Sequence, residues 1–230
     1  MNLTPHPLEI FYHARNGKPG CLFCEPIEGM VLEETQNFRV LIDTFPITSG
    51  HVMISSKAHY GSAGEVPLEL FDELCELKRR VKKELASLYG HTICYEHGPG
   101  GCCSSSDPDA IQCEHFHFHC LPLNLSIAPE LMKRFEKIEL NDYREIIPYF
   151  FEHGNYLYCE DPSGKMMFFP AEDEIIEPHL LRTLISRALG SPDLSDWESY
   201  EDPGLFLKSY ELVTNLMDFS DSEVVCDLLG

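Results

Sequence analysis

The chain has 230 residues, of which 43% are hydrophobic and 24% are charged, as in ordinary globular proteins. Its 17 Lys and Arg against 38 Asp and Glu give a net charge of −21. Because non-specific nucleic-acid binding and docking on anionic membranes both need basic surface, this charge argues against both partners. The apolar runs are short and interrupted by charge, so no membrane-spanning segment is predicted. The ten Cys, without a visible secretory signal, predict reduced thiols and a cytoplasmic protein.

Negative charge is concentrated toward the end of the chain. Residues 1–149 hold 21 acidic and 13 basic side chains, a balance of −8, whereas residues 150–230 hold 17 and 4, a balance of −13. This shift in composition predicts three parts. They are an amino-terminal segment at 1–19, a main domain at 20–149 and an acidic carboxy-terminal extension at 150–230.

The first part of the chain predicts four strands and one long helix. Short β-branched and apolar runs bounded by Pro or Gly are typical of strands, and they lie at 38–43, 51–55, 92–96 and 113–121. Apolar residues recur at three- and four-residue steps from Leu68 to Leu88. Pro67 precedes this run and Gly90 follows it, which predicts an amphipathic helix. The Gly- and Ser-rich stretch at 98–107 predicts a loop.

The later part predicts one hairpin and several helices. A helix is expected to begin near Leu131 and to break at Pro148. Residues 156–159 and 166–169 predict a hairpin, and the helical patterns that follow lie at 179–189 and 205–217. Strands and helices occur without a repeated βαβ unit, so the predicted fold class is α+β.

Three histidines alternate with apolar residues in the strand predicted at 113–121. Because successive side chains of a strand point to opposite faces, His115, His117 and His119 share one face. Phe116 and Phe118 share the other face, which is expected to pack on the predicted helix. Buried imidazoles are costly without partners, so a use for them is expected. They are suited either to nucleophilic and proton-transfer chemistry or to binding zinc.

A CxxC pair lies upstream, at Cys21 and Cys24. Such a pair is found in zinc half-sites and in redox sites, and it also occurs by chance. Pro26 and Gly29 argue against the helix that a thioredoxin-like redox site needs. A zinc site needs two further ligands, which His59 and one histidine of the alternating run would supply.

The run His-Phe-His-Phe-His-Cys-Leu at 115–121 resembles the signature of the HIT (histidine triad) superfamily. The CxxC segment resembles the amino-terminal segment of that superfamily, and the spacing from Asp43 to His51 to His59 is also similar. The resemblance covers about residues 20–125. It implies a HIT-like antiparallel sheet with a long packed helix. It also implies a nucleotide hydrolase or nucleotidyl transferase, such as a phosphoramidase or a dinucleoside polyphosphate hydrolase.

The same resemblance implies roles for individual residues. His117 corresponds to the nucleophile that attacks the α-phosphorus and forms a nucleotidyl-histidine. His119 and His51 correspond to residues that hydrogen-bond phosphate oxygens or the surroundings of the nucleophile, and Asp43 to the carboxylate that binds ribose. In the zinc-containing branch the metal ligands correspond to Cys21, Cys24, His59 and His115. A purine nucleotide is the expected ligand, and small members of the superfamily are commonly homodimers.

Two departures from the family pattern affect the expected phosphate site. Glu96-His-Gly98 replaces N-x-G, which puts an acid where an amide usually contacts phosphate. Gln112 stands where Ser or Thr is usual, and we expect it and the amides of the loop from Gly98 onward to contact the nucleotide. His97 is expected to be an exposed loop histidine. Two alternatives stay open: a zinc metalloenzyme that uses all three triad histidines, and a nucleotide-binding module without catalysis.

Overall fold

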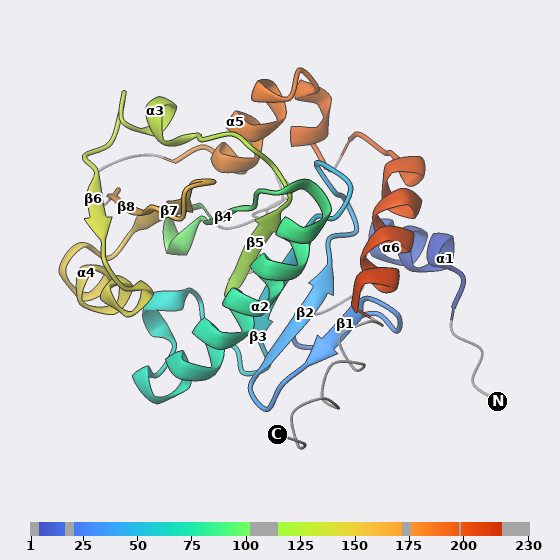
Figure 1. Cartoon of the computed structure of the whole chain (residues 1–230), viewed down its shortest axis with the longest axis horizontal. Coiled ribbons are helices and arrows are strands. Elements are labelled where there is room, and N and C mark those ends of the chain that lie inside the picture. Colours follow the sequence, from blue (N-terminus) through green and yellow to red (C-terminus); the bar gives the residue numbers. More distant parts are fainter. Residues whose placement is uncertain (1–4, 17–20, 102–114, 172–175, 198, 218–230) are drawn as a thin grey trace, which may run out of the picture.

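In the computed structural model, residues 5–16, 21–101, 115–171, 176–197 and 199–217 are described. Eight of their segments form one antiparallel sheet in the order β1-β2-β3-β5-β4-β7-β8-β6 (Figure 1). The strands are β1 (Val31–Glu34), β2 (Phe38–Ile42), β3 (Val52–Ser56), β4 (Ile93–Glu96), β5 (His117–Leu121), β6 (Ile138–Leu140), β7 (Tyr156–Glu160) and β8 (Met166–Pro170). With its helices, this sheet confirms the predicted α+β class and the HIT-like sheet with a long packed helix.

The helices differ greatly in length. They are α1 (Pro7–Arg15), α2 (Phe71–Tyr89), α3 (Ala128–Leu131), α4 (Ile146–His153), α5 (Leu180–Ala188) and α6 (Pro203–Met217). Short 3₁₀ turns are η1 (Ala63–Glu65), η2 (Leu68–Leu70), η3 (Gly98–Gly101), η4 (Tyr143–Glu145) and η5 (Pro192–Ser195). Among the described residues, no helix has the length and apolar character needed to cross a membrane.

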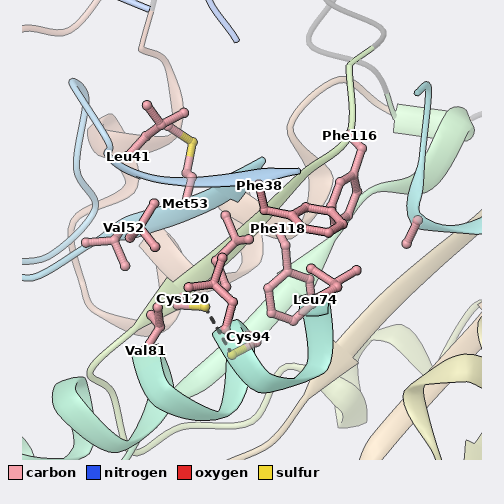
Figure 2. Close-up of a cluster of buried hydrophobic side chains, with 14 of the residues drawn as sticks. Phe38, Leu41, Val52, Met53, Leu74, Val81, Cys94, Phe116, Phe118 and Cys120 are labelled. Carbon is pink, nitrogen blue, oxygen red and sulfur yellow. Dashed lines mark hydrogen bonds between the residues drawn. The ribbon is translucent and has the colours of Figure 1, made fainter. Parts of the chain in front are cut away.

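The longest helix, α2, covers one face of the sheet, as its spacing predicts. It ends at Gly90, whose φ of 80° is the left-handed conformation that glycine tolerates at a helix end. Its buried side chains recur along one stripe, and they include Leu74, Leu77 and Val81. Leu74 and Val81 lie beside Phe118 and Cys120 of β5 (Figure 2), and Leu77 belongs to the same buried cluster. Each fully buried Leu or Phe contributes about 1.5–3 kcal/mol to folding, so this stripe anchors the helix to the sheet.

A second hydrophobic cluster covers the opposite face of the sheet around β4 and β7. Tyr95, Leu121 and Leu157 point to this side and pack against Leu131 of α3 and Ile185 of α5. The sheet is therefore buried on both sides in this region. Residues of α5, which come from the acidic extension, cover the same face of β4 and β5 as His119.

The region after residue 150 continues the sheet of the first part. The predicted hairpin is confirmed as β7 and β8, and β7 pairs antiparallel with β4. The boundary expected after residue 149 falls within α4. The predicted helix break at Pro148 is wrong, because Pro148 occupies the first turn of α4, where backbone N–H groups have no partner inside the helix. The helix expected from Leu131 onward is replaced by the end of α3 and by β6.

The helices α1 and α6 pack together at the β1 end of the sheet (Figure 1). The rings of Phe11 and Phe206 have their centroids 5.5 Å apart at the centre of this contact. Ser209 of α6 accepts a hydrogen bond of 3.0 Å from the backbone N–H of Gly50. Helix α6 therefore holds the turn at Gly50, which comes directly before His51 and β3.

Candidate functional site

The three triad histidines belong to two different side-chain clusters. His115 lies just before β5, and its Nδ1 is 3.4 Å from the sulfur atoms of both Cys21 and Cys24. The Nδ1 of His59 is 3.2 Å from the sulfur of Cys24. The four ligand atoms all lie within 4.8 Å of one another. The structure thus brings together all four residues predicted to bind the metal.

The donor geometry of this cluster fits a tetrahedral ion. Zinc bonds of about 2.3 Å to sulfur and about 2.0 Å to nitrogen put tetrahedral ligand atoms roughly 3.3–3.8 Å apart. The sulfur–nitrogen distances of 3.2 to 3.4 Å lie close to that range. The Nε2 of His115 donates to the carbonyl oxygen of Ser56 at 2.8 Å, which leaves Nδ1 as the ligand atom. These four residues form a cluster that can hold a metal ion.

His117 is the first residue of β5, and its ring is held from two directions. Its Nδ1 is 2.8 Å from the carbonyl oxygen of His115. Since a carbonyl only accepts, Nδ1 carries the proton and the lone pair of the ring is on Nε2. The ring of Phe23 stacks on the imidazole with centroids 4.6 Å apart and an angle of 15°. Phe23 lies between the two cysteines in sequence. The CxxC segment therefore supplies two residues of the cluster of Cys21, Cys24, His59 and His115 (the metal-type cluster) and also contacts His117.

His119 and His51 form a buried pair next to Asp43. The Nε2 of His51 is 2.9 Å from the Nδ1 of His119, and the Nδ1 of His51 is 3.3 Å from a carboxylate oxygen of Asp43. Tyr95 stacks on His119 with a centroid distance of 4.4 Å. The imidazoles of His117 and His119 meet edge to face at 4.9 Å. The structure thus brings the three predicted catalytic histidines together.

Burial keeps these imidazoles neutral at pH 7. It lowers the pKa of His51 to about 4, against the opposing attraction of Asp43. Burial also lowers the pKa of His119 well below its usual value and lowers the pKa of His117. Arg182 adds a repulsive positive charge that lowers the pKa of His51 and His119 further. Neutral imidazoles are the form that can attack an electrophile or accept a proton.

Asp43 is enclosed by groups from both parts of the chain. One carboxylate oxygen accepts a hydrogen bond of 2.7 Å from the backbone N–H of Phe45. The other lies 3.7 Å from the guanidinium of Arg182 on α5. Arg182 also donates to the carbonyl oxygens of Leu194, at 2.8 Å, and of Phe45. Asp43 is therefore 5% exposed. The sequence held no signal for this contact beyond a single cation in a predicted helix.

The residues next to β4 differ from the predicted phosphate site in two respects. His97 is buried, not exposed, and its Nε2 accepts the backbone N–H of Leu181 at 3.1 Å. The prediction of an exposed loop histidine is therefore wrong, and burial lowers the pKa of His97 to about 3. Gly98 has a φ of 56°, and an added Cβ would lie 2.6 Å from the carbonyl oxygen of Tyr156. Glycine is thus required there, while Gln112 lies outside the described residues.

Glu96 points away from the histidines. Its carboxylate accepts from the backbone N–H of Ala63 at 2.8 Å, from the Tyr156 hydroxyl at 2.9 Å and from the Tyr143 hydroxyl at 3.4 Å. The expectation that this acid occupies the phosphate site is wrong, because strand alternation places Tyr95 on the histidine face and Glu96 on the α2 face. Burial raises the pKa of Glu96 to about 7.

The described residues contain two groups of three or more His, Cys, Asp or Glu with ligand atoms within 4.8 Å of one another. One is the Cys21, Cys24, His59 and His115 cluster, and the other consists of Asp43, His51 and His119. Neither group unites the three triad histidines. The geometry therefore gives no support to the alternative of one zinc ion held by all three.

Fold and site together define a class: an α+β protein whose central antiparallel strand carries alternating histidines, beside a cluster of two cysteines and two histidines. No family model matches the chain. It is 26% identical over 136 residues to an uncharacterized HIT-like protein of Saccharolobus solfataricus, covering 55% of this chain and 91% of that protein. It is 29% identical over 111 residues to an uncharacterized HIT-like protein of Methanocaldococcus jannaschii, covering 44% of this chain and 78% of that protein. The triad motif and these relatives make the chain similar to HIT-like proteins.

The search of solved structures finds a partial match to a yeast Ap4A phosphorylase crystallised with AMP. That structure has a TM-score of 0.40 and 14% identity, and the match covers 65% of this chain and 63% of that protein.

Proposed function

We propose that the protein is a nucleotide hydrolase or nucleotidyl transferase that acts through a covalent nucleotidyl-histidine on His117. The observation that carries this proposal is the hydrogen bond from the Nδ1 of His117 to the carbonyl oxygen of His115, at 2.8 Å. It selects the tautomer whose lone pair is on Nε2, as a nucleophilic imidazole needs. The stack of Phe23 on the same ring holds its plane. The similarity to HIT proteins adds the precedent for attack at phosphorus.

The proposed reaction has two displacement steps. First, the Nε2 lone pair of His117 forms a bond to the α-phosphorus, and the bond from phosphorus to the leaving group breaks. The leaving group takes the electron pair and is protonated from solvent water, and this proton is returned to solvent in the second step. Second, the oxygen of water, or of an acceptor hydroxyl, attacks the same phosphorus and the N–P bond breaks. The attacking oxygen releases its proton, the electron pair returns to Nε2, and His117 is regenerated.

The groups beside His117 would stabilise charge on the phosphorus. We propose that His119 and His51 hydrogen-bond the phosphate oxygens or hold the nucleophile, since they form the pair at 2.9 Å beside its ring. Asp43 would bind ribose hydroxyls, and the backbone around Gly98 would contribute N–H groups. Because Asp43 is enclosed by Phe45 and Arg182, ribose binding at its carboxylate requires these contacts to rearrange.

The cluster of Cys21, Cys24, His59 and His115 would hold a zinc ion with a structural role. Its donor set of two thiolates and two imidazoles is a usual one for structural zinc. When bound, the ion would tie the CxxC segment to the start of β5. In this proposal the chain's own residues perform the chemistry, and His115 serves through the metal and through its carbonyl contact with His117.

The expected ligand is a small purine nucleotide derivative, and the proposed location is the cytoplasm. The charge of −21 supports the exclusion of non-specific nucleic-acid and membrane partners. A homodimer is also proposed. The two outer strands of the described sheet are β1 and β6, so a sheet shared between two copies would be formed through one of them. The main domain at 20–149 and the extension at 150–230 are proposed to act together, since α5 reaches Asp43.

Intact-protein mass after a brief, cold quench tests the covalent step. The substrates are adenosine phosphoramidate and a diadenosine polyphosphate. Wild type is expected to gain the mass of one AMP moiety, as is His91→Ala, which changes an exposed histidine outside the site. His117→Ala is expected to gain none. An adduct that persists in His117→Ala, or AMP release without any adduct in wild type, would count against the mechanism.

A nucleotide-binding module without catalysis is the second candidate. The observation that favours it is Glu96, which stands where the family pattern has an amide that contacts phosphate and which instead accepts hydrogen bonds from Ala63 and Tyr156. Calorimetric binding of AMP, together with no adduct and no turnover of either substrate, would support this candidate over the enzyme.

A further inference from the structure

A cavity lies on the face of the sheet opposite the histidines. It has a volume of about 460 Å³ and lies between α2, η4 and the turn from β7 to β8. Paired residues of antiparallel strands share a face, and Cys94 pairs with Glu160 while Tyr95 pairs with Cys159. Tyr95 stacks on His119, so Glu160 and the cavity are on the other side. The cavity is therefore separate from the site described above.

The residues that line this cavity carry a net positive charge, whereas the whole chain carries a net negative charge. Five basic side chains border it: Lys78, Arg79, Lys82, Lys83 and Arg144. Asp142 and Glu160 are the two acidic ones, so the lining carries a formal charge of +3 from five cations less two anions. The whole chain has only 17 basic residues and a net charge of −21. A positive cavity on such a protein attracts anions locally, in a surrounding field that repels them.

The inner wall of the cavity holds more positive than negative charge. The ammonium of Lys78 is 2.8 Å from a carboxylate oxygen of Glu160, and Lys82 pairs with the same carboxylate. The side chains of Lys78, Lys82 and Glu160 are 8%, 24% and 4% exposed. Two largely buried cations thus share one carboxylate, so the inner wall carries a net positive charge. Lys78 also lies 3.9 Å from the centroid of the Tyr143 ring and donates to the Tyr158 hydroxyl at 3.0 Å. Buried charges are usually paired, so this excess is a reason to expect an anionic ligand.

The arginines at the outer rim of the cavity form ion pairs that a ligand can replace. Arg79 pairs with Glu76, and Arg144 pairs with Asp72 and Asp142. The side chains of Arg79 and Glu76 are 65% and 60% exposed, and exposed pairs of this kind contribute about 0–1 kcal/mol. A multiply charged ligand can therefore exchange with these carboxylates at small cost.

We propose that this cavity binds an oligophosphate chain of two or three phosphates. Lys78 and Lys82 would meet the inner phosphate, and Arg79, Lys83 and Arg144 would meet the outer ones. Arginine forks and lysine ammonium groups are the usual partners of phosphate oxygens. The volume is within the range of small-molecule sites, about 300–1,000 Å³. Several cations around one cavity favour a ligand that carries several charges close together.

Calorimetric titration with inorganic tripolyphosphate tests the proposal, with wild type beside two double variants of equal charge change. Arg79→Gln with Lys83→Gln removes two rim cations of the cavity. Lys133→Gln with Lys137→Gln removes two cations outside its lining, and both of these also pair with nearby glutamates. The first variant is expected to bind at least about tenfold more weakly, a loss of about 1.4 kcal/mol. The control is expected to stay within about twofold of wild type.

Equal losses in both double variants, or no binding of tripolyphosphate to wild type, would overturn the proposal. Arg144→Gln gives a second rim variant, and thermal unfolding confirms that each protein is folded. ATP is titrated into the same proteins to compare a free with a nucleoside-linked phosphate chain. A loss confined to the cavity variants for both probes supports recognition of the chain itself. A loss of affinity that is seen for ATP alone overturns it. Binding of tetraglutamate by a protein that does not bind tripolyphosphate also overturns it.

Discussion

Phe23 lies flat on the imidazole of His117, with ring centroids 4.6 Å apart and an interplanar angle of 15°. The contact links the CxxC segment to the proposed nucleophile, since Phe23 stands between Cys21 and Cys24. The stack therefore links the position of the metal-type cluster to that of the proposed nucleophile.

Phe23→Leu is expected to slow formation of the nucleotidyl-histidine about tenfold, which corresponds to about 1.4 kcal/mol in the barrier. Leucine keeps a buried apolar side chain but cannot hold the imidazole plane by stacking, a contact of about 0.5–1.5 kcal/mol. Quenched-flow mass spectrometry measures the rate. Leu22→Ala, at the neighbouring half-buried position, is the control, and zinc content is measured for both. An unchanged rate in Phe23→Leu would show that the stack does not position His117.

The cluster of two cysteines and two histidines is expected to bind one zinc ion per chain. Cys24→Ser and His59→Ala each remove one ligand and are expected to lower the bound zinc well below one equivalent. Cys75→Ser changes a thiol outside the cluster and is expected to retain it. Elemental analysis of the purified proteins measures the metal. Full zinc content in Cys24→Ser would contradict the assigned ligand set.

Removal of zinc by a chelator is expected to lower the thermal stability of wild type. A ligand that binds only the folded state stabilises it by about 4 kcal/mol when its free concentration is about 1,000 times the dissociation constant. Differential scanning calorimetry with and without chelator measures the shift in Tm, with Cys24→Ser as the control that should not respond. Equal shifts in both proteins would mean that the metal acts elsewhere.

Glu96→Gln is expected to change how stability depends on pH. Burial raises the pKa of Glu96 from 4.5 to about 7 in the folded state. Because the folded state holds this proton more tightly than the unfolded state, the stabilising contribution is full below pH 4.5 and is lost as pH rises through 7. Glutamine resembles the protonated acid at every pH. The variant should therefore gain stability relative to wild type between pH 5 and 8.

Urea unfolding at several pH values measures this difference. Glu152→Gln, which changes an exposed carboxylate of α4, is the control and is expected to follow wild type. The buried histidines change stability with pH in both proteins in the same way, so the comparison isolates Glu96. A constant difference between Glu96→Gln and wild type across this range would show that the carboxylate does not titrate there.

Arg182→Lys is expected to destabilise the fold by about 1–3 kcal/mol, the cost of leaving buried polar groups without a partner. The guanidinium of Arg182 bonds two carbonyl oxygens, of Phe45 and Leu194, and lies beside Asp43. A lysine ammonium keeps the charge but cannot reproduce the planar fork. Arg187→Lys on the exposed face of α5 is the control, and urea unfolding measures both. Equal stability of the two variants would indicate that the cap over Asp43 contributes little.

The sequence by itself determined the elements whose signals are local. The period-two pattern of His115 to His119 and the stripe from Leu68 to Leu88 depend only on backbone geometry. The strand is confirmed as β5 from His117 onward, with His115 just before it, and the helix as α2 from Phe71 onward, with Leu68 in the preceding 3₁₀ turn. The resemblance to the HIT pattern also indicated which residues form the metal-type cluster. The predicted helix break at Pro148 is wrong because the sequence does not distinguish a proline in the first turn of a helix from a proline that ends one.

Only the tertiary structure decided where side chains from distant parts of the chain meet. Glu96 turns to the α2 face because the register of β4 with β5 and β7 places Tyr95 on the histidine side. His97 is buried because α5 packs over it, and Arg182 reaches Asp43 for the same reason. Such contacts depend on strand register and helix packing across many residues. No short pattern in the sequence encodes them, since each is stabilised by the burial that the whole fold creates.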